Sequence, residues 1–144
     1  MFQDDKANGI GIYMKSDGTV YRGEWVNDLY HGNGKLTLKS GEIYEGRFEN
    51  GLKNGIGKLM HLDGSIYEGD WKDGKIEGCG KYTWKNGKSY TGKFFDNKMH
   101  GFGTYDYGDG NIYVGNFQKD KKHGKGKYKY KNGIIFKGNF ENNV

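Results

Sequence analysis

The 144-residue sequence contains no proline, one cysteine and only two arginines. Because Cys79 is alone, the chain has neither a disulfide framework nor a thiolate metal site, which is typical of a reducing compartment. No N-terminal apolar stretch resembles a signal peptide, and no run approaches the roughly 20 apolar residues of a spanning helix. We therefore expect a cytoplasmic protein without a membrane span.

What the chain has in abundance is a 23-residue repeat. The copies span 21–43, 44–66, 67–89, 90–112 and 113–135, with a half-copy at 1–20 and another at 136–144. Glycine fills positions 3, 12, 14 and 21, which hold 24 of the 27 glycines. Tyrosine or phenylalanine fills position 1, and an aromatic residue always fills position 5. So short a fixed period indicates a stacked array of one small unit, forming a single domain over residues 1–144.

The repeat also decides between an ordered and a disordered chain. Only 33% of residues are hydrophobic, 28% are charged and the mean hydropathy is −0.98, a composition that disordered segments share. However, 17 of the 23 aromatic residues fall at positions 1, 5 and 16 of the copies. A disordered chain has no physical reason to keep such columns, so we predict a folded but thin structure.

Alternation within each copy indicates β-strands. Positions 1 to 6, as in 44–49, place aromatic residues and glycine on one face and charged residues on the other. A second alternating run begins at position 14 and reaches about position 18, and no 3.6-residue period occurs. We predict an all-β fold: an elongated, twisted, single-layer antiparallel sheet of consecutive 23-residue β-hairpin repeats.

The parity of the columns predicts the turn between copies. An Asp-Gly, Asn-Gly or Ser-Gly pair lies at each junction, and a two-residue loop would put Tyr82 on the charged face. A three-residue loop that ends in a left-handed glycine instead places Tyr82 opposite Tyr90 and Gly80 opposite Gly92. We therefore predict type I turns with a glycine bulge, and aromatic rings that lie across the strand glycines.

These columns resemble the MORN repeat (membrane occupation and recognition nexus), whose pattern is similar to Y-x-G-x-W/F-x-x-G-x-x-H-G-x-G. The stretches 90–103 and 113–126 match it closely, and the resemblance covers essentially the whole chain. It implies a twisted sheet of hairpins with an aromatic groove that acts as a scaffold. Position 8 is glycine only at Gly51 and Gly74, and position 11 is histidine only at His31, His100 and His123.

The sequence offers no catalytic constellation, so we expect no enzyme, no cofactor and no metal site. The Gly87-Lys88-Ser89 run lacks the upstream glycine of a phosphate-binding loop. The His31, His100 and His123 column would bring only two histidines into neighbouring copies, too few for a metal site, so we interpret them as loop histidines.

The aromatic face is the first candidate binding surface, suited to a helix or an extended peptide. We expect it to form a groove lined by Tyr21, Trp25, Tyr44, Phe48, Tyr67, Trp71, Tyr82, Trp84, Tyr90, Phe94, Tyr105, Tyr107, Tyr113, Phe117, Tyr128 and Tyr130. Six aromatic residues outside the columns are expected to be exposed: Tyr30, Trp84, Phe95, Phe102, Tyr107 and Tyr130.

A basic C-terminal segment is the second candidate. Residues 1–90 hold 13 basic and 13 acidic side chains, whereas residues 91–144 hold 10 and 5. An anionic partner would meet Lys119, Lys121, Lys122, Lys125, Lys127, Lys129 and Lys131. We expect the last four to share one face of a strand, where lysines attract anionic lipid or an acidic protein. Nucleic acid is disfavoured because arginine is nearly absent.

Three functional hypotheses follow. The first is a non-enzymatic scaffold that binds a protein segment along the aromatic groove, within the cytoskeletal or ciliary assemblies that the family resemblance implies. The second is a peripheral membrane module that recognises anionic phospholipid through the basic copies. The third is the regulatory repeat portion of a larger enzyme. Unpaired strands at the sheet edges also predict homo-oligomers or larger assemblies.

Overall fold

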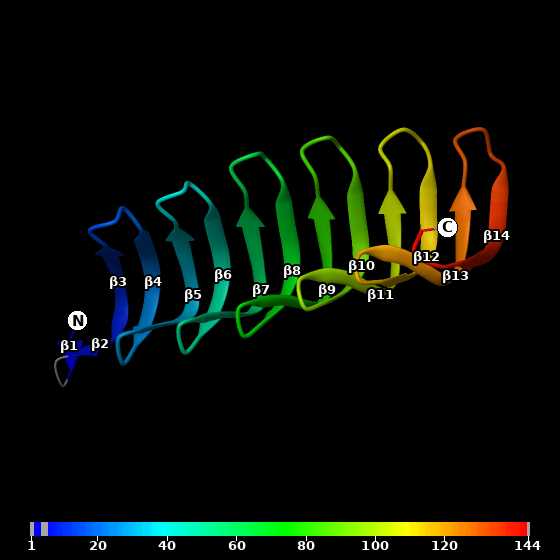
Figure 1. Ribbon diagram of the computed structural model, residues 1–144. Helices are drawn as coiled ribbons and strands as arrows, with labels where there is room; N and C mark the ends of the chain where they lie inside the picture. Colours follow the sequence, from blue (N-terminus) through cyan, green and yellow to red (C-terminus); the bar gives the residue numbers. More distant parts are fainter. Residues whose placement is uncertain (1, 4–5, 144) are drawn as a thin grey trace. The chain divides into compact units, whose positions relative to one another are not determined.

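The computed structural model describes residues 2–3 and 6–143, and their regular structure is entirely β-strand (Figure 1). Two short strands, β1 (Phe2–Gln3) and β2 (Lys6–Ala7), pair with each other. The other twelve strands form one open antiparallel sheet whose strand order follows the sequence. Among the described residues, no helix is long and apolar enough to cross a membrane. The prediction of an all-β, antiparallel hairpin array is confirmed.

The chain divides into two compact units, Met1–Lys75 and Ile76–Val144, which are described separately. The N-terminal unit contains β3 (Gly9–Met14), β4 (Val20–Val26), β5 (Leu29–Thr37), β6 (Ile43–Glu49), β7 (Leu52–Met60) and β8 (Ile66–Lys72). The C-terminal unit contains nearly all of β9 (Lys75–Thr83), then β10 (Ser89–Phe95), β11 (Lys98–Asp106), β12 (Ile112–Gln118), β13 (Lys121–Lys129) and β14 (Ile135–Phe140).

The second strand of each copy is longer than predicted, because it begins at position 9 and not at position 14. Only two residues join it to the first strand, as between β10 and β11. Those two residues, Asp96 and Asn97, have φ angles of 53° and 65°, which define a type I′ turn. Asn, Asp and Gly tolerate this conformation. The variable residues at position 8 therefore serve the same turn.

Five turns between copies have the predicted three-residue type I form with a glycine bulge, and the turn at residues 108–110 departs from it because Gly108 has a φ angle of 82°. In one of the five, the Gly41 N–H donates to the Leu38 C=O (2.8 Å), and the Leu38 N–H donates to the Glu42 C=O (2.9 Å). Gly41 has a φ angle of 100°, in the left-handed region that glycine favours. The parity of the aromatic columns was enough to exclude the two-residue alternative.

The predicted register is also confirmed. Tyr82 lies opposite Tyr90, Gly80 lies opposite Gly92, and Tyr105 pairs with the tyrosine at the start of β12. The aromatic side chains at positions 1 and 16 and the strand glycines opposite one another therefore share one face of the sheet.

A bend in each copy brings the tyrosine at position 1 into the core. Between Gly92 and Phe94 the register with β11 shifts, so that Lys93 has no partner on that strand. The Tyr90 hydroxyl donates a 2.8 Å hydrogen bond to the Lys93 C=O, and Tyr90 is fully buried. Its ring covers Gly103, where a Cβ would overlap the ring. The predicted packing of rings across glycines is confirmed. The same hydroxyl bond occurs at Tyr21, Tyr44, Tyr67 and Tyr113.

Side chains at position 10 complete the core by covering these tyrosines. Tyr30 stacks on Tyr21 with ring centroids 3.9 Å apart, so its packing is internal and the prediction that it is exposed is wrong. Ile76 and Met99 fill the equivalent place and are each 8% exposed. Position 10 is tyrosine, lysine, isoleucine or methionine in different copies, so no constant residue type in the sequence predicts that its side chains cover the tyrosines.

Candidate binding surface

The structure separates the sixteen predicted groove residues into a core group and a surface group. The ten rings at positions 1 and 5 form the core. The position-1 tyrosines are at most 1% exposed, and Phe48, Trp71, Phe94 and Phe117 at most 6%. A partner cannot reach these rings without opening the sheet, so they support a surface and do not line it. Trp25 is half-buried.

The other six rings form one continuous row, which we call the aromatic ladder: Tyr82, Trp84, Tyr105, Tyr107, Tyr128 and Tyr130. Strands β9, β11 and β13 each contribute a tyrosine at position 16 and a second ring just beyond the strand end. Ring centroids are 4.7 Å apart within each such pair and 5.4–5.5 Å apart between successive pairs. Five of the rings are half-buried, including Trp84 and Tyr107, for which the prediction of exposure is wrong. Tyr130 is 44% exposed, as predicted.

The ladder belongs to the C-terminal unit alone. At the same two positions the N-terminal unit has Tyr13 with Lys15, Leu36 with Leu38, and Leu59 with His61. The copies share the framework that orients these side chains, whereas the side chains themselves differ between the units. A continuous row of paired rings therefore occurs only in the part of the chain within residues 76–143.

Two lysines approach the middle of the ladder. The Lys122 Nζ donates to the Tyr107 hydroxyl at 3.2 Å and lies 5.1 Å from the Tyr128 ring centroid, while the Lys88 Nζ lies 6.0 Å from the Tyr107 centroid. Such geometry gives cation–π attraction. Burial lowers the pKa of Lys122 and raises the pKa values of Tyr105, Tyr107 and Tyr128. The hydroxyls of Tyr105, Tyr107 and Tyr128 thus remain protonated donors at neutral pH.

The predicted basic patch is only partly assembled. Lys125, Lys127 and Lys129 are exposed and alternate with Gly126 and Tyr128, so they lie on the face opposite the ladder. The expectation that Lys131 continues this row is wrong, because β13 ends at Lys129 and Lys131 lies in the following turn.

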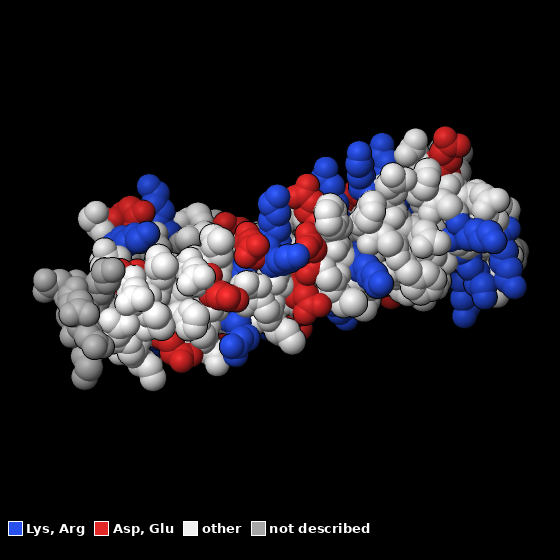
Figure 2. All heavy atoms as spheres, turned by 90° about the horizontal axis from the view of Figure 1, so that it is seen from below, with Lys and Arg blue, Asp and Glu red and all other residues white. Residues whose placement is uncertain are grey.

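Lys122 also departs from the predicted patch, because its ammonium group points into the aromatic face. Lys119 and Lys121 lie at and just after the type I′ turn. Figure 2 shows lysines gathered at the C-terminal end, whereas acidic and basic side chains interleave over the N-terminal unit.

Two further aromatic residues are exposed, as predicted, but they lie away from the ladder. Phe95 and Phe102 are each 57% exposed. Phe102 neighbours Gly103 in the alternation of β11, so it faces away from Tyr105 and the other rings of the ladder. It provides a matched control for any test of the aromatic face.

The histidine column lies on strands and not in loops, because the second strands begin at position 9. His31 and His123 are half-buried in β5 and β13, and the Nδ1 atom of each is buried without a hydrogen-bond partner. His61 pairs with Glu42 at 2.5 Å. Within the described part of the chain, no group of three His, Cys, Asp or Glu side chains is placed to hold a metal ion.

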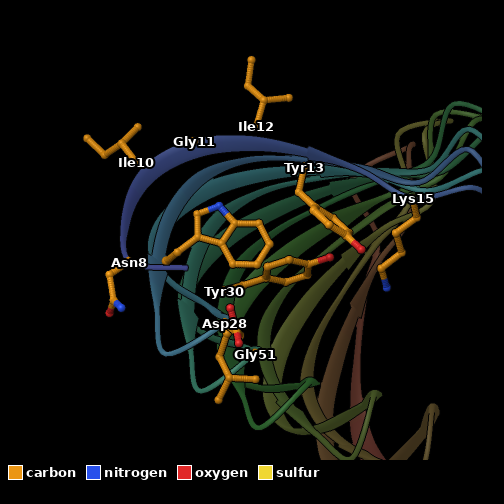
Figure 3. Close-up of a pocket in the computed structure, with 11 residues that line it drawn as sticks. Asn8, Ile10, Gly11, Ile12, Tyr13, Lys15, Asp28, Tyr30 and Gly51 are labelled. Carbon is orange, nitrogen blue, oxygen red and sulfur yellow. The ribbon is translucent and has the colours of Figure 1, made fainter. Parts of the chain in front are cut away.

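The N-terminal unit has a pocket of about 530 Å³ between β3, β4 and β5. Figure 3 shows the strands curling around Tyr13 and Tyr30, while Ile10 and Ile12 point away from the interior. Trp25 contacts both tyrosines edge to face, with its ring centroid 5.6 Å from that of Tyr13 and 5.1 Å from that of Tyr30. The strands around this pocket curl in the same way as the strands that bury the position-1 rings in the other copies.

Two-strand units in a constant register, with tyrosine rings packed on glycines, define a β-hairpin repeat protein. A sequence model of the MORN repeat matches residues 1–20, 21–43, 44–66, 67–89, 90–112 and 113–135. The chain therefore belongs to the MORN-repeat family. No curated protein matches it in a sequence search.

Among solved structures, the TCP domain of SAS-4 (dCPAP) from Drosophila melanogaster, in complex with a proline-rich motif of Ana2 (dSTIL), has a similar fold. The two chains are 13% identical with a TM-score of 0.51, over 89% of this chain and 77% of that one. At this identity the likeness concerns the fold alone.

Proposed function

We propose that this chain is a protein-interaction module that binds a polypeptide segment along the aromatic ladder. The observation that carries the proposal is the unbroken row of six partly exposed rings on a sheet whose core is already filled by other rings. Membership of the MORN-repeat family supports it, since MORN repeats are generally interaction modules. The Drosophila domain of similar fold, solved with a bound peptide motif, supports it as well.

The physical basis is the rigidity of the ladder. Tyrosine and tryptophan supply large contact areas with few rotatable bonds, so little conformational entropy is lost on binding. Rings that already touch their neighbours at 4.7–5.5 Å are further restricted. Aromatic residues of this kind are the usual hot spots of interfaces, where truncation costs 2 kcal/mol or more.

A peptide-display selection tests the proposal. Peptides enriched on the wild-type chain should lose at least about tenfold in affinity for Tyr107→Ala. They should bind Phe102→Ala as tightly as wild type, because Phe102 is a more exposed ring than Tyr107 but lies on the other face. Equal binding to wild type and Tyr107→Ala, with both folded by circular dichroism, would overturn the proposal.

A second candidate function is recognition of anionic phospholipid by the exposed lysines of β13. Lys127 lies directly opposite Lys137 on β14, and like charges placed so destabilise a sheet. An anionic surface would offset that repulsion, at about 1 kcal/mol for each lysine near a membrane. Lys125→Glu with Lys127→Glu should abolish sedimentation with phosphatidylserine vesicles. Sedimentation that is absent in the wild type, or unchanged in the variant, would contradict it.

The cytoskeletal or ciliary setting is part of the proposal and rests on the family resemblance. Imaging of a tagged chain in its native cells tests it, since a uniform cytosolic distribution would contradict an assembly-bound scaffold.

A further inference from the structure

The aromatic ladder has a fixed spacing along the sheet, and that spacing restricts what can lie on it. Tyr82, Tyr105 and Tyr128 belong to alternate strands, β9, β11 and β13. Because neighbouring strands are about 4.8 Å apart, equivalent rings recur about every 9.6 Å. A segment that runs across the strands must present the same face at that interval to contact every ring pair.

A polyproline II helix meets this condition. It has three residues per turn and a rise of about 3.1 Å per residue, so side chains on one face repeat about every 9.3 Å. This repeat differs from the spacing of equivalent rings by only about 0.3 Å. In an α-helix, side chains on one face repeat after two turns, or about 10.8 Å. This repeat exceeds the spacing of equivalent rings by more than about 1 Å for each copy. A β-strand advances about 10 Å in three residues but then points its side chain the opposite way.

The strands that carry the ladder cannot accept an added strand. Each of β9, β11 and β13 is already paired, so their backbone groups are used within the sheet. An occupant must therefore bind through side chains and through hydrogen bonds to tyrosine hydroxyls. The polyproline II backbone has no internal hydrogen bonds, so its carbonyl groups are free to accept them.

Charge adds a second restriction. The Lys88 and Lys122 ammonium groups both approach Tyr107, near the middle of the ladder. Among the described residues, no carboxylate forms an ion pair with Lys122, whose ammonium group is held by rings and by the Tyr107 hydroxyl. The C-terminal unit as a whole holds 13 lysines against 6 acidic residues.

We propose that the aromatic ladder binds a proline-rich, acidic segment in the polyproline II conformation, which lies across strands β9 to β13 with a carboxylate near Lys88 and Lys122. This inference rests on the proposed function and names the chemistry of its partner. The prolines pack on the rings at three-residue intervals, because the pitch of the segment matches the interval of the repeat.

Fluorescence anisotropy with three labelled 12-residue peptides tests the inference. The probes are four repeats of Pro-Pro-Glu, of Pro-Pro-Lys and of Gly-Gly-Glu. We expect the Pro-Pro-Glu peptide to bind and the other two to bind at least about tenfold more weakly. The Pro-Pro-Lys peptide carries the opposite charge, and the Gly-Gly-Glu peptide lacks the preformed helix. Tyr107→Ala should weaken the Pro-Pro-Glu peptide about tenfold or more, whereas Phe102→Ala should leave it within twofold.

If the Pro-Pro-Glu peptide binds, two further results would still overturn the inference. One is equal binding of the Gly-Gly-Glu and Pro-Pro-Glu peptides, which would show attraction by charge alone. The other is a Pro-Pro-Glu affinity that neither Tyr107→Ala nor Tyr130→Ala changes; Tyr130, at the exposed end of the ladder, serves if the first variant fails to fold. If display-selected peptides bind through the ladder but the Pro-Pro-Glu peptide does not, the proposed function stands and this inference falls.

Discussion

The tyrosine side chain at position 1 of each copy has three structural roles. Its ring fills the core, its hydroxyl donates to the carbonyl at position 4, and its face covers the glycine at position 14. The glycine is required because no other residue leaves room for the ring. Phe136 has the position-1 place in the last half-copy without a hydroxyl, and it is 51% exposed.

Substitution of that glycine should therefore be more harmful than substitution of a turn glycine. Gly103→Ala places a Cβ on the Tyr90 ring, and we expect a loss of about 3 kcal/mol in the free energy of unfolding, or failure to fold. Gly87→Ala meets nothing within 4 Å and only strains a φ of 91°, which costs about 1–2 kcal/mol. Urea denaturation measures both, and equal losses would contradict the account.

At the scale of elements, the type I′ turns tie each copy to the copy before it. The Asn97 side chain accepts a 2.8 Å hydrogen bond from the Ile76 N–H, and the Asn97 N–H donates to the Ile76 C=O at 3.0 Å. Asp120 makes the same pair of bonds with Met99. Where position 8 is glycine, as at Gly51, only the backbone bond is present.

This difference predicts how the wild type and two variants at position 97 rank in stability. Asn97→Gly keeps the left-handed backbone and loses one side-chain hydrogen bond, at a cost of about 1 kcal/mol. Asn97→Ala also strains a φ of 65° and should cost about 2–3 kcal/mol. Thermal or urea unfolding of the two variants gives the order, and an alanine variant as stable as the glycine variant would contradict it.

At the scale of the whole molecule, the buried tyrosines couple stability to alkaline pH. Burial raises the pKa of Tyr21 and of Tyr44 to about 12. Between pH 10 and 12 the unfolded chain loses these protons while the folded chain keeps them. The folded state then binds more protons, so its stability is complete below pH 10 and falls as the pH rises.

We expect the free energy of unfolding to fall above pH 10 by at most about 1.4 kcal/mol per pH unit for each such tyrosine. Tyr44→Phe keeps the ring and removes one titrating group, so its slope should be smaller than that of the wild type. Chemical denaturation at pH 8, 10 and 11 measures both slopes. Identical slopes for the two proteins would show that Tyr44 does not contribute.

Charge is also unequal between the two units. The N-terminal unit holds 10 basic and 12 acidic residues, a net −2, and the C-terminal unit holds 13 and 6, a net +7. Both the aromatic ladder and the exposed lysine row belong to the positive unit. Anionic or acidic partners are therefore attracted to the unit that has the candidate surfaces.

The sequence by itself determined the repeat, the sheet, the register and the turn between copies. Period and parity suffice for these, because a shift of one residue would move every aromatic side chain to the other face. It did not separate the rings at positions 1 and 5, which are core, from the rings at and beyond position 16, which are partly exposed. It also did not reveal that the second strands begin at position 9. It also assigned Lys122 to the basic patch, whereas its ammonium group lies among the rings. Those features depend on the bend at the register shift, which brings position 10 over the rings. Only the tertiary structure shows which aromatic columns that bend covers and which it leaves open to a partner.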